Sequence, residues 1–206
     1  MRISVITVCF NSAKTLTRTL DSVAEQDYPE IEHIVIDGGS FDGSVNILTT
    51  YSGKLAHVLS EPDEGIYDAM NKGLKLASGD VLCFLNADDH YACPTVLSSV
   101  SKKMRTNNLD VLIGDVGFFR EQSPSKITRR YRSDRFTPDR LGWGWMPAHP
   151  AMFITKEVVQ RVGKFRTDYH IAGDFDFYFK NFFRPISQIY PYSRNSGKYA
   201  NWWCKH

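Results

Sequence analysis

Apolar, mostly β-branched stretches alternate with helical patterns through the first half of this chain, and this alternation limits the folds open to it. Between the apolar stretches, residues such as Leu16, Leu20 and Val23 recur at helical spacing. Strands are predicted over residues 3–10, 31–36, 57–60 and 81–85. Strands and helices that alternate with short connections predict an α/β fold, in which a mostly parallel sheet carries helices on both faces.

Two adjacent carboxylates follow the fourth predicted strand. Residues 81–85 are all apolar, as is typical of a strand buried on both faces, and Asp88 and Asp89 come just after them. Ligands of open α/β sheets bind at the carboxyl ends of the strands, so these acids are candidates for a metal and phosphate site. The simpler hypothesis is that they turn the chain and cap a helix that begins near Pro94. Taken alone, the two acids favour neither alternative.

Further polar side chains are expected at the same edge of the sheet. Asn11 follows the first predicted strand and Asp37 follows the second, and helix capping does not require such a convergence. The chain contains neither GxGxxG after its first strand nor GxxxxGK[ST], so the dinucleotide and P-loop motifs are not indicated. Without a P-loop lysine, a bound nucleoside diphosphate needs a divalent cation, and Mg²⁺ uses one or two carboxylates together with phosphate oxygens.

The second half of the chain is less regular and contains a basic cluster. A strand is predicted over residues 110–113, and a pair of strands over 116–120 and 127–132. The arginines that cluster near the end of this pair are Arg129, Arg130, Arg132 and Arg135. Such a run usually marks a solvated face, and contact with an anionic acceptor or a membrane surface is the less favoured hypothesis.

Aromatic residues and one further carboxylate complete the candidate site. Trp143 and Trp145 lie between glycines and prolines, where they either stack on sugar rings or anchor the core. His149 stands close to two prolines, and a structural role is the commoner one for such a histidine. Asp174 begins a helical pattern rich in aromatic residues, and is either the helix cap or a general base.

Composition excludes several classes of protein. The chain has 206 residues, enough for one domain with a sizeable core, and a net charge of +2 that does not indicate nucleic acid binding. It contains neither an apolar run of transmembrane length nor an evident signal peptide. Its four cysteines form no CxxC pair and its histidines lack ligand spacing, so a zinc site is not expected. A reducing, cytoplasmic setting is therefore predicted.

Five segments, taken in order, resemble the signature of the family 2 glycosyltransferases. They are residues 7–11 (TVCFN), 35–44 (VIDGGSFDGS), 65–73 (GIYDAMNKG), 84–89 (FLNADD) and 172–174 (AGD). The chain is most similar to bacterial members that build capsule, exopolysaccharide or O-antigen repeat units. The resemblance implies the GT-A fold, a three-layer α/β/α sandwich with a mostly parallel, Rossmann-like sheet.

The resemblance also implies roles for individual residues. The nucleotide-sugar donor is expected to contact Thr7, Cys9, Asn11, Asp37, Asn71 and Asp88. Asp88 and Asp89 match the family's DXD-type motif, which implies Mg²⁺ or Mn²⁺ bound mainly by Asp89, with Asp88 beside it on the ribose or on a metal-bound water. Asp174 matches the catalytic base, and the acceptor is expected to contact Trp143, Trp145 and His149.

The implied activity is a metal-dependent, inverting transfer of a sugar from a UDP-, GDP- or dTDP-sugar to a saccharide. The acceptor is expected to be lipid-linked, so the resemblance implies a cytoplasmic protein with peripheral contact at the inner face of the cytoplasmic membrane. Residues 1–183 are predicted to form the GT-A domain, with a nucleotide-sugar-binding half over 1–114 and an acceptor-binding and catalytic half over 115–183. Residues 184–206 are an atypical C-terminal segment.

Three departures from the family pattern keep alternatives open. Asn86 stands where many members carry an acid, Gly38 replaces a frequent second acid after Asp37, and residues 184–206 show no clear periodicity. A catalytically inactive nucleotide-sugar-binding subunit of the same fold is therefore the main alternative. A nucleotidyltransferase is less favoured, because no glycine-rich basic loop for a triphosphate is present.

Overall fold

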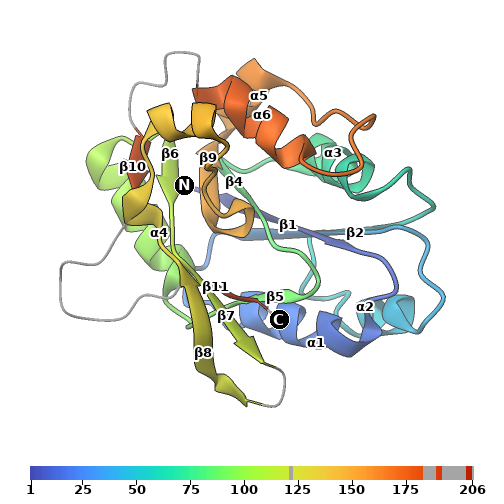
Figure 1. The fold of residues 1–206 in the computed structure, drawn as a ribbon. Helices are drawn as coiled ribbons and strands as arrows, with labels where there is room; N and C mark the ends of the chain where they lie inside the picture. The colour runs from blue at the N-terminus through green and yellow to red at the C-terminus, as the bar shows by residue number, and fades with distance from the viewer. Residues whose placement is uncertain (121–122, 183–188, 192–202, 206) are drawn as a thin grey trace.

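The computed structural model describes residues 1–120, 123–182, 189–191 and 203–205, which form a large sheet between two layers of helices and a smaller sheet beside it (Figure 1). The large sheet has the strand order β10-β6-β9-β4-β1-β2-β3. Its strands are β1 (Ile3–Cys9), β2 (Ile31–Asp37), β3 (His57–Ser60), β4 (Val81–Phe84), β6 (Val111–Ile113), β9 (Met152–Thr155) and β10 (Ile189–Pro191). Among the helices of the described residues, none has the length and apolar composition needed to span a bilayer.

All but one of these strands run parallel to one another. β1 pairs in parallel with both β2 and β4, β2 with β3, and β6 with β10. Only β9, of the strands described, runs antiparallel to its neighbours β4 and β6. β9 enters the sheet after the excursion of residues 114–151 instead of after a crossover helix, so its direction is not constrained to be parallel. The predicted α/β fold with a mostly parallel sheet is therefore confirmed.

The two helix layers pack on opposite faces of β1 because its side chains alternate. Ile3 and Val5 lie toward one layer, whereas Ile6 and Val8 lie toward the other. The first layer contains α1 (Ala13–Ala24), α2 (Ser44–Thr50) and α4 (Val96–Asn107). The second contains α3 (Ile66–Leu76), α5 (Lys156–Val162) and α6 (Gly173–Phe182).

The smaller sheet has the strand order β5-β11-β7-β8. Its strands are β5 (Asp89–Tyr91), β7 (Val116–Arg120), β8 (Ser123–Tyr131) and β11 (Trp203–Lys205). β7 and β8 form an antiparallel hairpin, which confirms the strand pair predicted there. Most of the predicted C-terminal segment 184–206 lies outside the described residues; its described parts are β10 in the large sheet and β11 in the small one.

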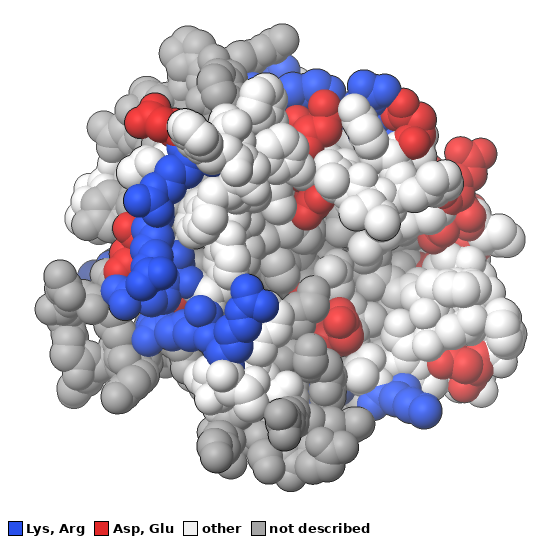
Figure 2. Space-filling model, in the orientation of Figure 1, with Lys and Arg blue, Asp and Glu red and all other residues white. Residues whose placement is uncertain are grey.

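Arginines gather on β8 and the segment after it. Figure 2 shows a band of Lys and Arg side chains along the side of the molecule that carries β8. Arg130 is bonded to the buried Asp115 at 2.6 Å, and Arg132 is paired with Asp134. The guanidinium of Arg129 lies over the ring of Phe118, 5.3 Å from its centroid.

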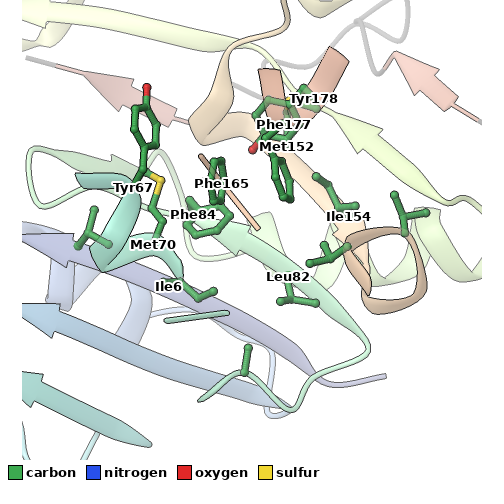
Figure 3. Packing of buried hydrophobic residues seen from close by; sticks show 14 of the residues in the cluster. Ile6, Tyr67, Met70, Leu82, Phe84, Met152, Ile154, Phe165, Phe177 and Tyr178 are labelled. Carbon is green, nitrogen blue, oxygen red and sulfur yellow. The ribbon is translucent and has the colours of Figure 1, made fainter. Parts of the chain in front are cut away.

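The core of the second layer is largely aromatic. Phe165 stacks on Phe177 with a centroid distance of 4.0 Å and meets Phe84 of β4 edge-on at 5.3 Å. Figure 3 shows these rings together with Ile6 of the sheet and Met70 of α3. Burying one such side chain stabilises the fold by about 1.5–3 kcal/mol, so this cluster fixes α3 and α6 over the sheet.

A buried carboxylate ties the amino ends of the strands together. Glu32 of β2 is 1% exposed and accepts hydrogen bonds from the hydroxyls of Ser4 and Ser78, while Arg2 lies 3.4 Å away. Burial alone would raise the pKa of Glu32, but the bonds from Ser4 and Ser78 and the charge of Arg2 outweigh it and lower the pKa to about 2.

The depressed pKa of Glu32 predicts acid sensitivity. The stabilisation is complete above the ordinary glutamate pKa of about 4.5 and is lost as the pH falls toward 2, which amounts to about 3 kcal/mol. We expect Glu32→Gln to lower the free energy of unfolding at pH 7 and to reduce its fall between pH 5 and pH 2, as measured by urea denaturation. Glu30→Gln, an exposed neighbour, is the control, and an equal acid dependence in Glu32→Gln and wild type would contradict this account.

Candidate active site

A cavity of about 410 Å³ opens at the carboxyl ends of β1 and β4. Its walls come from the end of β1, the loop after β4, the turn before α3 and the first turns of α3. The lining residues are Val8, Cys9, Phe10, Ser12, Asp63, Gly65, Ile66, Ala69, Asn86, Ala87 and Asp88. This edge of a parallel sheet is where α/β proteins bind ligands, and the N-terminus of α3 adds a partial positive charge that favours phosphate.

Asp37 joins the ends of three neighbouring strands. It is fully buried at the end of β2 and accepts hydrogen bonds from the backbone N–H and hydroxyl of Ser40, from Ser60 Oγ at 2.7 Å, and from the thiol of Cys9 at 3.5 Å. Burial alone would raise the pKa of Asp37, but the bonds from Ser40 and Ser60 outweigh it and hold the pKa below its usual range. Asp37 therefore stays ionised next to Cys9, which lines the cavity.

The loops after β1 and β2 are bonded to each other. The backbone N–H of Asn11 donates to Ser40 Oγ at 2.8 Å, and its side-chain oxygen accepts from the N–H of Phe41 at 3.0 Å. The rings of Phe10 and Phe41 meet edge-on with a centroid distance of 6.2 Å, and both are largely exposed. Asn11 thus fixes the loop that carries Phe10 into the cavity wall, and Phe10 presents an open aromatic face beside it.

The tandem acids lie in different environments. Asp88 is partly exposed on the cavity wall, whereas Asp89 begins β5 and is 1% exposed. Asn86 also lines the cavity, and its buried Oδ1 has no hydrogen-bond partner among the described residues. Within the same residues, no group of three or more His, Cys, Asp or Glu side chains is arranged to hold a metal. The carboxylate of Asp88 and the unused oxygen of Asn86 nevertheless fit a Mg²⁺-type ion that takes its remaining ligands from phosphate and water.

Like Asp37, two further residues predicted to contact the donor form hydrogen bonds inside the protein. Thr7 is fully buried, and its hydroxyl lies 3.0 Å from Nε2 of His33, whose pKa burial lowers to about 3. Asn71 donates to the carbonyl of Phe165 and accepts from its N–H, each at 2.9 Å. Both side chains form hydrogen bonds to other parts of the protein, and their direct contact with a donor stays a prediction.

Asp174 lies beside the first turn of α3. It is in the first turn of α6, partly exposed, and its Oδ1 accepts from the hydroxyl of Tyr67 at 3.3 Å and from the N–H of Phe175 at 2.9 Å. Tyr67 follows Ile66 and Gly65, which both line the cavity. The candidate base and the candidate donor cavity are therefore linked through one helical turn.

The three residues predicted to bind the acceptor differ in exposure. Trp143 is 90% exposed. Trp145 is partly buried between the rings of Tyr131 and Phe136, at centroid distances of 5.4 and 5.6 Å. His149 is buried, with Nδ1 2.7 Å from the hydroxyl of Tyr178 and its ring stacked on Phe84. Of the three, Trp143 has the face open to a ligand, and acceptor binding by the other two stays a prediction.

Asp63 is a cavity residue that sequence analysis missed. An ideal Cβ on Gly38 would lie 2.5 Å from Oδ2 of Asp63, so the carboxylate fills the space where a side chain at position 38 would begin. Asp63 also accepts from the N–H of Gly65 at 2.9 Å. The sequence around Asp63, Glu-Pro-Asp-Glu-Gly, is typical of a turn, and no local pattern shows that it reaches the loop after β2.

Known proteins of similar sequence define the family. Residues 4–184 match the family described as Glycosyl transferase family 2. The uncharacterized glycosyltransferase Rv1514c of Mycobacterium tuberculosis is 35% identical over 185 residues, which cover 85% of this chain and 66% of that protein. This chain thus spans about two thirds of the length of that relative.

Solved structures show the same architecture. S. aureus TarS superposes with a TM-score of 0.79 at 21% identity, over 100% of this chain and 36% of that one. The mannosyltransferase PcManGT from Pyrobaculum calidifontis, solved with GDP-Man and Mn²⁺, has a TM-score of 0.63 at 24% identity, over 87% of this chain and 51% of that one. The chain has a GT-A-like α/β fold. It belongs to glycosyl transferase family 2, as its motifs predicted.

The environment of the cavity's thiol predicts low reactivity. Burial, followed by the charge of Asp37, raises the pKa of Cys9 far above that of a free thiol, and burial raises the pKa of Cys83 to about 12. Cys93 is exposed. We expect iodoacetamide at pH 8 to modify Cys93 at least about tenfold faster than Cys9 or Cys83, measured by peptide mass spectrometry. Equal rates for Cys9 and Cys93 in the folded protein would contradict this environment.

Proposed function

We propose that this chain binds a nucleotide-sugar in the cavity at the ends of β1 and β4 and transfers the sugar to an acceptor with inversion. The observation that carries the proposal is the cavity itself, where Asp88, Asn86 and the N-terminus of α3 surround one space. Such a site stabilises a diphosphate in two ways: its side-chain oxygens can hold a divalent cation, and the backbone N–H groups of the helix N-terminus can donate to the phosphates. The exposed ring of Phe10, beside the buried Asp37, offers a surface for the base and ribose.

Comparison with related proteins supports a donor of this class. TarS has been solved in complex with UDP and with UDP-GlcNAc, and PcManGT with GDP-Man and Mn²⁺. For this chain, UDP-, GDP- and dTDP-sugars are all candidates. Asp88 and Asp89 are the proposed ligands of Mg²⁺ or Mn²⁺, with the amide oxygen of Asn86 close by. When bound, the cation acts as a Lewis acid that stabilises the departing diphosphate.

Asp174 is the proposed general base. Its carboxylate takes the proton of the acceptor hydroxyl, whose oxygen attacks the anomeric carbon on the side opposite the leaving diphosphate. The bond to the diphosphate breaks as the new glycosidic bond forms, so one displacement inverts the configuration. No covalent sugar–enzyme intermediate is formed.

The acceptor is proposed to be a saccharide, carried on a lipid, in the synthesis of a capsule, exopolysaccharide or O-antigen. Trp143 offers an open aromatic face for a sugar ring. The exposed Arg129 and Arg135 supply positive charge for an anionic lipid surface or a phosphate of the acceptor, which supports a cytoplasmic protein in peripheral contact with the membrane. Residues 1–114 and 115–183 are proposed as the donor and acceptor halves.

Donor binding is predicted to depend on a divalent cation and on the tandem acids. We expect UDP, GDP or dTDP to bind with at least about tenfold higher affinity in the presence of Mn²⁺, measured by isothermal titration calorimetry. Asp88→Asn and Asp89→Asn are each expected to abolish that gain. Asp27→Asn is the matched control, because Asp27 is exposed and precedes β2 at the opposite edge of the sheet. Equal Mn²⁺ dependence in all variants would refute the metal assignment.

Transfer is predicted to depend on Asp174. Asp174→Asn removes the base but keeps the size of the side chain, so kcat should fall by about 10²–10⁴-fold while nucleotide affinity changes little. The assay is release of nucleoside diphosphate from the donor that calorimetry selects, in the presence of saccharide acceptors. A variant with undiminished kcat would place the base elsewhere, and binding without turnover in wild type would favour the inactive subunit.

A further inference from the structure

Helix α3 contacts both halves of the proposed site with different sides of the same two turns. Ile66 and Ala69 line the donor cavity. Tyr67 and Asn71, four residues apart and so on one face of the helix, contact the segment from Phe165 to Asp174. The helix that forms a wall of the cavity therefore also holds the segment that carries the proposed base.

The ring of Tyr67 sets where α6 begins. It is 8% exposed and stacks on Phe165 with a centroid distance of 5.8 Å and an interplanar angle of 18° (Figure 3 labels both rings). A Cβ on Gly173 would lie 2.8 Å from a ring carbon of Tyr67, so the glycine lets the backbone of α6 approach the ring directly. Ala172, just before it, has a positive φ of 65°. Asp174 follows at once.

The hydroxyl of Tyr67 selects one oxygen of that carboxylate. It donates to Oδ1 of Asp174 at 3.3 Å, and the N–H of Phe175 donates to the same oxygen at 2.9 Å. Within the described residues, no donor is bonded to Oδ2. The two oxygens of Asp174 are therefore not equivalent: Oδ1 is held by the protein, and Oδ2 is available to an acceptor hydroxyl.

We propose that Tyr67 is a positioning residue for Asp174, holding Oδ1 so that Oδ2 takes the proton of the acceptor hydroxyl. This inference rests on the proposed function, in which Asp174 is the base. Tyr67 keeps its own proton throughout; the proton that moves goes from the acceptor oxygen to Oδ2.

The protonation of Tyr67 supports this role. Burial, followed by the negative charge of Asp174, raises the pKa of the phenol. The hydroxyl therefore remains a donor at neutral pH. Asn71 assists from the next turn, because its two hydrogen bonds to Phe165 keep that ring stacked on Tyr67.

The test is Tyr67→Phe, which keeps the ring packing and removes only the hydroxyl. We expect kcat to fall about tenfold, while KM for the donor and for the acceptor stays within about twofold of wild type. Tyr51→Phe is the matched control, because Tyr51 also donates to a carboxylate, Asp21, at 2.6 Å but lies outside the cavity. The control should change neither constant. Unchanged kcat in Tyr67→Phe, with Asp174→Asn inactive, would overturn the positioning role alone.

A second measurement tests the Tyr67–Asp174 contact without turnover. The ¹³Cζ shift of labelled Tyr67 is followed by NMR through its alkaline titration in wild type and in Asp174→Asn. Loss of the carboxylate charge should lower the pKa of Tyr67. The other titratable groups near Tyr67 are Glu64 and His170, which line a small cavity beside it, and they are the same in both proteins. An unchanged pKa would overturn the inference. Wild-type protein that binds no nucleotide and transfers no sugar would instead overturn the proposed function on which the inference rests.

Discussion

The buried carboxylate of Asp37 is the constraint on which the donor side of this structure depends. It lies at the end of β2 and binds the ends of both neighbours, β1 through Cys9 and β3 through Ser60. An ionised group in that position is costly unless it is satisfied, and here hydroxyl, thiol and backbone donors satisfy it. The same bonds fix the loops after β1 and β2, and thus the wall formed by Cys9 and Phe10.

The two halves of the proposed site meet at α3. Its first turn closes the cavity, and its opposite side carries Tyr67 and Asn71, which hold Phe165 and Asp174. An enzyme that transfers a sugar between two bound molecules must hold its base at a fixed position relative to the donor, because a small misplacement lowers the reaction rate strongly. Helix α3, which is buried against the sheet through Met70, fixes that relative position.

Much of the fold follows from the sequence because its parallel strands are apolar and its turns are marked. The strands at 57–60 and 81–85, the hairpin and the mostly parallel sheet were all predicted. The side-chain roles were less predictable, because tryptophan and histidine occur both in sugar-binding sites and in protein cores. The sequence alone therefore does not show which role Trp145 and His149 have. The sequence has glycine at position 38, where many family members carry an acid. Only the fold shows that the carboxylate of Asp63, from another loop, fills the space that a side chain at position 38 would occupy. Tyr67 belongs to the motif at 65–73, but its partner Asp174 lies more than a hundred residues away.

If the cavity at the ends of β1 and β4 is the donor site, it should hold the nucleoside diphosphate that calorimetry selects. A crystal structure of the protein with that nucleotide and Mn²⁺ is the decisive experiment. We expect the diphosphate between the N-terminus of α3 and Asp88, with the base against Phe10. A nucleotide bound elsewhere would contradict the proposed donor site, for example in the cavity of about 280 Å³ that is lined by the end of α1, by His33 of β2 and by Tyr51 and Lys54 of the segment after α2.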